Sequence, residues 1–368
     1  MQRKLFGGPV AAILNTVARF EIPFSRYLDA ASNVVQALPA FAENPENLIA
    51  LYSMMVLTRL FDKKAINLQR IGKLGTYPSS LGQEAIYVGI GAAMLPEDVL
   101  CPYYRDIGAQ FWRGVTMEEI LLYWGGDEMG SDFKKARQDF PINVPIASQT
   151  LHAVGVGAAF QYRNESRVAL TTIGDGGTSR GDFYEALNVA GVWNLPVVFV
   201  VNNNQWAISV PRAKQTHAQT LAQKGIAAGV MGIQIDGNDV IAVKQVVAQA
   251  LNKARKGDGP TLIEAISYRM CDHTTADDAS RYRTQSELAE NEKKDPVLRL
   301  KNYMINKHFW DQKKQETLEQ EMAEKVSKAA ENYLMTPIRR PESMFEHLYQ
   351  TLPKQYENQV NELHRRGD

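Results

Sequence analysis

The sequence predicts an α/β protein with a doubly wound, mostly parallel sheet that has helices on both faces. In the centre of the 368-residue chain, short apolar runs alternate with helical segments. The runs show no polar alternation, which is typical of strands covered on both faces. Two successive runs end in polar residues, separated by about one strand–helix–strand crossover. Both strand ends are therefore expected at one edge of a parallel sheet.

The first part of the chain, residues 1–44, is interpreted as an N-terminal arm because its apolar patches are short and lack a clear period. Pro45 then opens a helix through about Arg70, in which apolar residues recur at helical spacing. A break containing two glycines follows, and a second helix is predicted at 82–94. We interpret residues 45–368 as one domain.

The centre of this domain alternates strand and helix, as expected for crossover units. Its C-terminal part, from about residue 286, is charged and rich in Glu, Lys, Ala and Leu, and is interpreted as a solvated helical flank. The predicted central elements are strands at 168–173, 197–201, 233–235 and 261–268 and helices at 182–192 and 240–256.

The composition argues against several classes of function. Lys plus Arg and Asp plus Glu both number 41, and this zero net charge gives no support for a nucleic-acid partner. Cys101 and Cys271 are too few for a disulfide framework or a cysteine-based zinc site, and suit a reducing compartment. No apolar run approaches the roughly 18 residues of a membrane helix, so no membrane partner is expected.

The first 20 residues lack acidic side chains and carry three basic ones, which suits a transit peptide. Their apolar stretch is interrupted by Gly7, Gly8 and Pro9, and no convincing cleavage site follows. An arm of a cytoplasmic protein is therefore favoured. A mitochondrial matrix protein with a cleaved N-terminal segment is the alternative.

Asp175 and Asn204 predict a metal site beside a diphosphate. Asp175 follows one apolar run within Gly-Asp-Gly-Gly, and Asn204 follows the next run as the last of three asparagines. A hard cation such as Mg²⁺ takes oxygen ligands from a carboxylate and an amide and leaves other positions to phosphate and water. The glycines let backbone approach a phosphate closely, and the next helix N-terminus adds partial positive charge. The crossover spacing favours Asn204 as the ligand and leaves Asn203 as the alternative.

Two other glycine pairs, Gly89 with Gly91 and Gly155 with Gly157, each form half of a dinucleotide-binding fingerprint. Each pair lacks the third glycine and neither follows a clean strand, so close helix packing is the better interpretation. A nicotinamide-dependent oxidoreductase is therefore disfavoured. The chain also has no Walker-type loop, so nucleoside triphosphate hydrolysis has no support.

The stretch GDGGTSRGDFYEALNVAGVWNLPVVFVVNNNQWAIS closely resembles alpha subunits of the decarboxylating component of 2-oxo acid dehydrogenase complexes. The resemblance extends over roughly residues 45–350 and is greatest to the bacterial two-chain pyruvate dehydrogenases. It implies a thiamine-diphosphate-binding fold, with thiamine diphosphate and Mg²⁺ as cofactors. It also implies an acetyl-transferring pyruvate dehydrogenase as the enzyme.

The resemblance assigns the residues that hold the metal and the diphosphate. Asp175, Asn204 and the backbone carbonyl of Trp206 match the magnesium ligands. An arginine beside the diphosphate makes chemical sense because its fork donates two hydrogen bonds to phosphate. The diphosphate-binding matches are the backbone of Gly176 and Gly177 and the pair Tyr104 and Arg105.

The resemblance also assigns the other end of the cofactor and a mobile loop. Val144, Ile146 and Ile208 match residues that contact or support the aminopyrimidine. Arg269 and His273 lie in Tyr-Arg-Met-Cys-Asp-His-Thr-Thr, which matches an active-site loop. Arg269 is expected on the diphosphate side. His273 is expected to transfer a proton or position the transition state, and to contact the cofactor.

Three positions leave questions open. Ser148 and Gln149 match a region that binds a monovalent cation in some relatives, but the match is weak. Thr274 occupies a position where animal relatives carry a regulated serine, so control by phosphorylation stays open. Cys271 and Asp272 replace commoner residues before the loop histidine, which leaves the geometry of the loop open.

The resemblance implies partners as well. A small-molecule 2-oxo acid is the substrate, and the acyl group passes to a lipoyl group on an acyltransferase. The carboxylate that activates the aminopyrimidine comes from a separate beta subunit. An alpha2-beta2 assembly is therefore expected, and the isolated chain should be nearly inactive.

Alternatives to pyruvate dehydrogenase remain. The chain could be the alpha subunit of a branched-chain 2-oxo acid or acetoin dehydrogenase, because one methylene changes discrimination by only about 1–3 kcal/mol. A non-catalytic assembly subunit that keeps the fold is an alternative from another class. Cofactor binding by the assembled complex distinguishes it from an enzyme.

Overall fold

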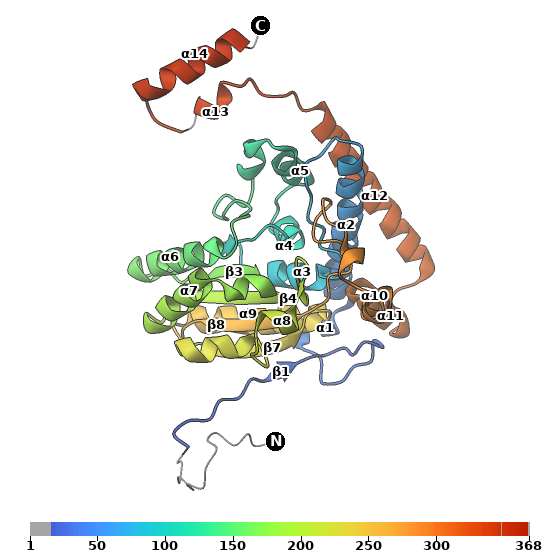
Figure 1. Ribbon diagram of the computed structural model, residues 1–368. Coiled ribbons are helices and arrows are strands. Elements are labelled where there is room, and N and C mark those ends of the chain that lie inside the picture. The colour runs from blue at the N-terminus through green and yellow to red at the C-terminus, as the bar shows by residue number, and fades with distance from the viewer. Residues whose placement is uncertain (1–15, 347, 367–368) are drawn as a thin grey trace.

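The computed structural model describes residues 16–346 and 348–366 (Figure 1). Its centre is a six-stranded sheet in which every neighbouring pair of strands runs parallel. A separate antiparallel pair, β5 (Trp206–Ala207) and β6 (Val210–Pro211), follows the sheet's β4. In spatial order the sheet consists of β1 (Phe24–Ser25), β7 (Met231–Asp236), β8 (Thr261–Ile266), β4 (Val197–Asn203), β3 (Ala169–Gly174) and β2 (Val99–Cys101).

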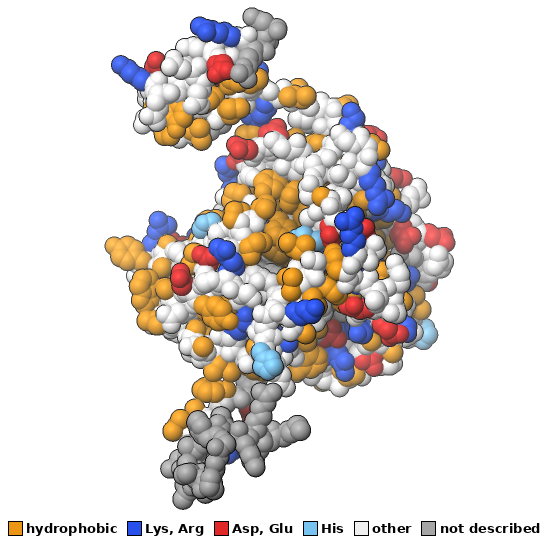
Figure 2. All heavy atoms as spheres, in the orientation of Figure 1, with side chains coloured by type: hydrophobic (Ala, Val, Ile, Leu, Met, Phe, Trp, Pro, Cys, Tyr) orange, Lys and Arg blue, Asp and Glu red, His pale blue; other side chains and the backbone are white. Residues whose placement is uncertain are grey.

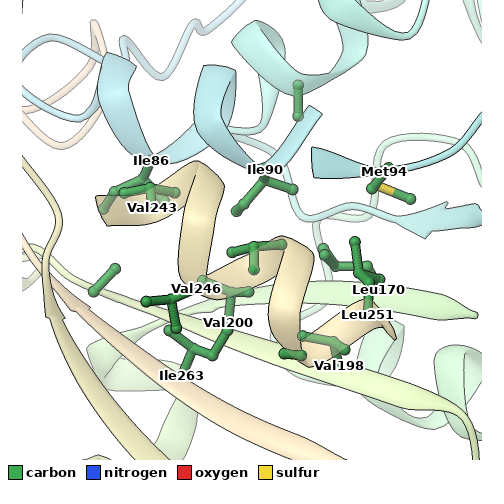
Figure 3. Close-up of a cluster of buried hydrophobic side chains, with 14 of the residues drawn as sticks. Ile86, Ile90, Met94, Leu170, Val198, Val200, Val243, Val246, Leu251 and Ile263 are labelled. Atoms are coloured by element: carbon green, nitrogen blue, oxygen red, sulfur yellow. The ribbon is translucent and has the colours of Figure 1, made fainter. Parts of the chain in front are cut away.

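Helices cover both faces of this sheet, which confirms the predicted doubly wound architecture. Successive residues of a strand point to opposite faces, so Val198 and Val200 of β4 join one core cluster while Phe199 and Val201 join another. Figure 3 shows the first cluster between sheet and helices. The helices of the first face are α3 (Glu84–Ala93) and α9 (Val240–Arg255), and those of the second are α6 (Ser148–Tyr162) and α7 (Gly181–Val192).

The long helix α2 (Pro45–Arg70) begins where the sequence predicts it. Asn44 caps its N-terminus by accepting a hydrogen bond from the Glu46 backbone N–H, and proline occupies the first turn. Its buried face packs against helices of the charged C-terminal part, whose opposite faces are exposed. These helices are α11 (Pro296–Asn306) and α12 (Gln312–Met335). Helix α10 (Gln285–Glu292) instead packs Leu288 against a cluster of Trp206, Tyr268 and Met270.

Several short elements escape the sequence patterns. Strand β2 has three residues, which is too few for a period to show. The start of α6 carries no side-chain cap, and its residue Ala147 has a left-handed φ of 74°. The other helices are α1 (Ala40–Glu43), α4 (Ile107–Trp112), α5 (Met117–Gly125), α8 (Arg212–Gln215), α13 (Ser343–Glu346) and α14 (Glu357–Arg366), the last two lying apart from the body in Figure 1.

Part of the segment interpreted as an arm is joined to the sheet. Strand β1 pairs with β7 and forms one edge of the sheet, and the backbone N–H groups of Tyr27 and Leu28 donate to the Asp239 carboxylate at 2.7 and 2.8 Å. Asp239 also caps α9. The predictions for the first 20 residues fall outside the described part of the chain up to residue 15, and the boundary at residue 44 stays a prediction.

The glycine pairs serve helix packing at three of four positions. A Cβ on Gly89 would lie 2.6 Å from Val243 of α9, and one on Gly91 would lie 2.8 Å from the Trp112 side chain. A Cβ on Gly157 would meet Val197, whereas Gly155 has open space. Close packing therefore explains Gly89, Gly91 and Gly157, and the structure gives no packing reason for Gly155. Among the described helices, none combines the length and apolar character needed to cross a bilayer.

Candidate active site

A cleft of about 510 Å³ lies at the carboxyl ends of β3 and β4. Gly174 of β3 pairs with Asn202 of β4, so Asp175 and Asn204 follow neighbouring strand ends, as predicted. Both residues line the cleft. Hydrophobic side chains gather near the centre of the face drawn in Figure 2. In the cleft, the apolar lining includes Ile173 and Val210.

All predicted site residues except one line this cleft. Arg269 is the exception: it lies behind the lining and donates to the backbone carbonyls of Trp206 (3.1 Å) and Ile208 (2.8 Å). The predicted residues in the lining are Tyr104, Arg105, Val144, Ile146, Asp175, Gly176, Gly177, Asn204, Trp206, Ile208 and His273.

Asp175 is a buried carboxylate at the start of a short 3₁₀ turn, Asp175–Ser179. Its Oδ2 accepts a hydrogen bond from Gln215 Nε2 at 2.8 Å. Burial raises the pKa of Asp175 to about 6, because desolvation disfavours the charged form. No ion pair with Asp175 occurs in the described part of the chain. The site therefore holds an acid whose charge the described protein leaves without a cationic partner.

The three successive asparagines occupy three different environments. Asn202 Nδ2 donates to Gln83 Oε1 (2.8 Å), and Asn202 Oδ1 accepts from Ser267 Oγ (2.7 Å). Asn203 Nδ2 donates to Glu264 Oε1 at 2.7 Å, and Asn203 is absent from the cleft lining. Asn204 alone of the three lines the cleft. The geometry thus favours Asn204 over Asn203 as the residue that faces a ligand.

Two buried guanidinium groups converge on His273. Arg105 and Arg269 are 1% and 0% exposed, and their terminal nitrogens lie 3.3 and 3.2 Å from His273 Nδ1. Burial and then these two cations lower the pKa of His273 to about 3, so the imidazole is neutral near pH 7. Burial and Arg105 also lower the pKa of Arg269. Among the described residues, neither arginine forms an ion pair with a carboxylate.

Ala147 and Ile208, which both line the cleft, have left-handed backbone conformations. Ile208 has a φ of 53°, which is costly for a β-branched side chain. The Ile208 carbonyl is held by Arg269, and the side chain is 55% exposed in the cleft. Val144 (47%) and Ile146 (46%) are exposed beside it. These three apolar side chains form a rim that the described chain leaves open.

Sequence patterns missed Gln215, which contacts the proposed metal ligand Asp175. Gln215 lies in the four-residue helix α8 and contacts Asp175, but nothing in its local sequence indicates that contact. Gln149 was considered for a cation and lines the cleft, with its Oε1 buried and without a hydrogen-bond partner. Ser148 Oγ instead bonds to Asn143 and to the Pro145 carbonyl.

Gly176→Ala is expected to destabilise the fold by about 1–3 kcal/mol, because the added Cβ would collide with the Ala207 side chain. Gly181→Ala is the matched control from the same loop, since its Cβ would meet only Glu185 Oε1 at 4.0 Å. Thermal unfolding of both variants checks this expectation. Equal melting temperatures would contradict the close approach at residue 176.

Comparison with known proteins decides the family. The model of the family described as "Dehydrogenase E1 component" matches residues 52–342, which is more than half of the chain. The chain belongs to the dehydrogenase E1 component family. This membership confirms the resemblance, the fold class and the enzyme class of 2-oxo acid dehydrogenases that the sequence predicted.

Relatives of this E1 chain cover nearly its whole length. The pyruvate dehydrogenase E1 component subunit alpha of Acholeplasma laidlawii is 44% identical over 321 residues, 86% of this chain and 92% of the relative. The subunit of the same name from Staphylococcus aureus strain Mu50 is 40% identical over 353 residues, 95% of each chain. That of Mycoplasma genitalium is 40% identical over 308 residues, 83% of this chain and 86% of the relative. Membership implies thiamine diphosphate as the cofactor and a partner subunit.

Proposed function

We propose that this chain is the alpha subunit of an acetyl-transferring pyruvate dehydrogenase that depends on thiamine diphosphate and Mg²⁺. One observation carries the proposal: a buried carboxylate, an amide and buried, unpaired guanidinium groups meet in and around one cleft. The relatives named above support pyruvate as the substrate. Since these relatives are bacterial, they also support a cytoplasmic location.

The donor set fits a hard divalent cation. Asp175 offers a carboxylate, Asn204 an amide oxygen, and Trp206 a backbone carbonyl, and all three residues line the cleft. Oxygen ligands of this kind suit Mg²⁺, which retains waters and binds substrate phosphates instead of a cage made only by protein.

The positive side of the cleft fits a diphosphate. Arg105 Nε is buried without a hydrogen-bond partner, and the Arg105 guanidinium packs 5.3 Å from the Tyr104 ring centroid. An anion beside Arg105 and Arg269 would relieve the repulsion between two buried cations. Gly176 and Gly177 line the cleft, and a Cβ at either position would collide with neighbouring side chains, so this tightly packed loop requires glycine.

When bound, thiamine diphosphate supplies the nucleophile and electron sink for decarboxylating a 2-oxo acid. Asp175, Asn204 and Arg105 would hold its diphosphate end and so orient the bound cofactor. Neutral His273, fixed by Arg105 and Arg269, presents an imidazole that accepts or donates a hydrogen bond near neutral pH. Ile208, Val144 and Ile146 offer apolar surface for the aminopyrimidine.

A beta subunit completes the proposed site. Of the described residues that line the cleft, Asp175 alone carries a carboxylate, and that group is assigned to the metal. The acid that activates the aminopyrimidine therefore belongs, in our proposal, to the partner that covers the apolar rim of Val144, Ile146 and Ile208. We propose an alpha2-beta2 tetramer that passes the acyl group to a lipoyl group on an acyltransferase.

The purified chain alone is expected to show almost no decarboxylation of pyruvate, because half of the site is missing. Addition of the cognate beta subunit, thiamine diphosphate and Mg²⁺ should restore activity. The assay measures the reduction of an artificial electron-acceptor dye with pyruvate as the substrate. Full activity of the isolated chain would contradict the division of the site between two subunits.

The reconstituted alpha–beta complex also distinguishes the proposed function from two alternatives. Faster turnover of branched 2-oxo acids or acetoin than of pyruvate would assign the chain to the corresponding dehydrogenase. Calorimetry that detects no thiamine diphosphate binding by the assembled complex would indicate a non-catalytic assembly subunit. Arg105 and Arg269 favour an enzyme over that alternative. Both are buried without a carboxylate partner among the described residues, and the repulsion between them destabilises a subunit that binds no anion there.

A further inference from the structure

Gln83 lies beneath the proposed metal site and is completely buried at the N-terminus of α3. Its Oε1 accepts a hydrogen bond from Asn204 Nδ2 at 2.9 Å and another from Asn202 Nδ2 at 2.8 Å. The Tyr87 hydroxyl donates a third, longer hydrogen bond to the same oxygen, at 3.5 Å. Gln83 Nε2 is buried, and among the described residues it has no hydrogen-bond partner. Gln83 therefore uses its acceptor and leaves its donors unused, which is costly for an amide that only fills space.

The orientation of the Asn204 amide follows from a group that is always a donor. The backbone N–H of Trp206 donates to Asn204 Oδ1 at 3.2 Å. A backbone N–H cannot accept, so Oδ1 and not Nδ2 must lie on the Trp206 side. Nδ2 must then lie on the other side, where only an acceptor satisfies it. Gln83 Oε1 is that acceptor.

We propose that Gln83 is a positioning residue that fixes the Asn204 amide with its oxygen available to the metal. A carbonyl oxygen has two lone pairs, and Trp206 uses one of them. A rotated amide would present Nδ2, which cannot ligate a hard cation. This proposal rests on the proposed function, because it requires the metal site that contains Asn204.

Gln83 is itself fixed by a buried hydrogen-bond network on the side away from the cleft. Asn202, its second donor, also accepts from Ser267 Oγ at 2.7 Å and contacts the hydroxyl groups of Tyr87 and Tyr103. This buried network ties α3 to the ends of β4 and β8. The orientation of Asn204 is therefore set partly from outside the cleft, because Gln83, Asn202 and Ser267 do not line it.

The test uses the assembled alpha–beta complex and measures metal binding directly. Mn²⁺ replaces Mg²⁺, and the free Mn²⁺ signal in electron paramagnetic resonance gives the dissociation constant with thiamine diphosphate present. Gln83→Met keeps the length of the side chain and removes the acceptor. It is expected to weaken Mn²⁺ binding about tenfold, because Asn204 Nδ2 loses its partner and the amide loses its orientation. Unchanged affinity would overturn the proposal.

Two further variants separate orientation from structural damage. Gln110→Met makes the same replacement at another buried glutamine, whose side-chain amide has no hydrogen-bond partner among the described residues and which does not line the cleft, so Mn²⁺ affinity should stay at the wild-type value. A loss as large as that of Gln83→Met would overturn the proposal. Gln83→Glu keeps an oxygen for Asn204 Nδ2 and is expected to retain affinity, so a large loss there also overturns it, even if Gln83→Met does not fold. If the wild-type complex binds no Mn²⁺, the proposed function itself fails.

Discussion

Asp175→Asn is expected to lower kcat/KM of the assembled complex for pyruvate by at least ~10³-fold, which corresponds to about 4 kcal/mol. The substitution removes the only carboxylate among the described cleft residues, while an amide of nearly the same shape remains. A hard cation loses its charged ligand, and the diphosphate loses the cation that neutralises it. Steady-state kinetics, together with Mn²⁺ binding, measure both losses.

The same variant is expected to stabilise the protein in the absence of metal. Burial raises the pKa of Asp175 to about 6, so the folded chain binds this proton more tightly than the unfolded chain does. Stability therefore falls as pH rises from about 4 to about 6, and the deficit persists above that range. Asparagine has no charge to bury, so in chelator the melting temperature of Asp175→Asn should exceed that of wild type at pH 8 and approach it at pH 5.

Asp182→Asn provides the matched control seven positions later. Its carboxylate lies in the first turn of α7, is one-third exposed and pairs with Arg180 at 3.1 Å. Exposed pairs contribute only about 0–1 kcal/mol, so activity should stay within about twofold of wild type. If Asp175→Asn retains metal binding, or if both variants lose it equally, Asp175 is not the ligand.

Arg105→Met is expected to raise the dissociation constant of thiamine diphosphate at least ~100-fold. Charge-assisted hydrogen bonds contribute about 1.5–3 kcal/mol each, and a guanidinium offers two to a phosphate. Calorimetric titration of the assembled complex in Mg²⁺ measures the change. The fold should lose less stability than expected for a buried arginine, because removing Arg105 also removes its repulsion with Arg269.

Arg299→Met is the contrasting variant. Arg299 is also buried, but it pairs with Asp236 at 2.7 Å and does not line the cleft. Its loss leaves a carboxylate unpaired and should destabilise the fold by about 3–5 kcal/mol. Cofactor affinity measured below the melting temperature should stay near wild type. Equal effects of both variants on affinity would remove the argument that Arg105 binds the diphosphate.

Local sequence patterns predicted much of the fold. The helix at 45–70 follows from apolar periodicity and its proline, and the strands at 169–174 and 197–203 follow from apolar runs without polar alternation. These elements depend mainly on residues that are neighbours along the chain, so a single sequence is enough to predict them. Strand β1 depends on an edge provided by β7 some 200 residues later, and no local pattern indicates that partner.

The site divides in the same way. Sequence motifs identified the glycine loop with Asp175 and the run of three asparagines. They also identified the arginine and the histidine of the loop after β8. The crossover spacing favoured Asn204 over Asn203 but left Asn203 as an alternative. The sequence could not show that Asn203 faces Glu264 while Asn204 faces the cleft, because these are tertiary contacts.

The sequence by itself determined the alternation of strands and helices, the residue types at the ends of two strands and the family to which they belong. Only the tertiary structure decided that Arg105 and Arg269 meet at one imidazole and that Gln83 holds the amide of Asn204. The physical reason is that charge repulsion, desolvation and amide orientation depend on distances of about 3 Å between groups from separate elements. Packing of the helices on the parallel sheet sets those distances.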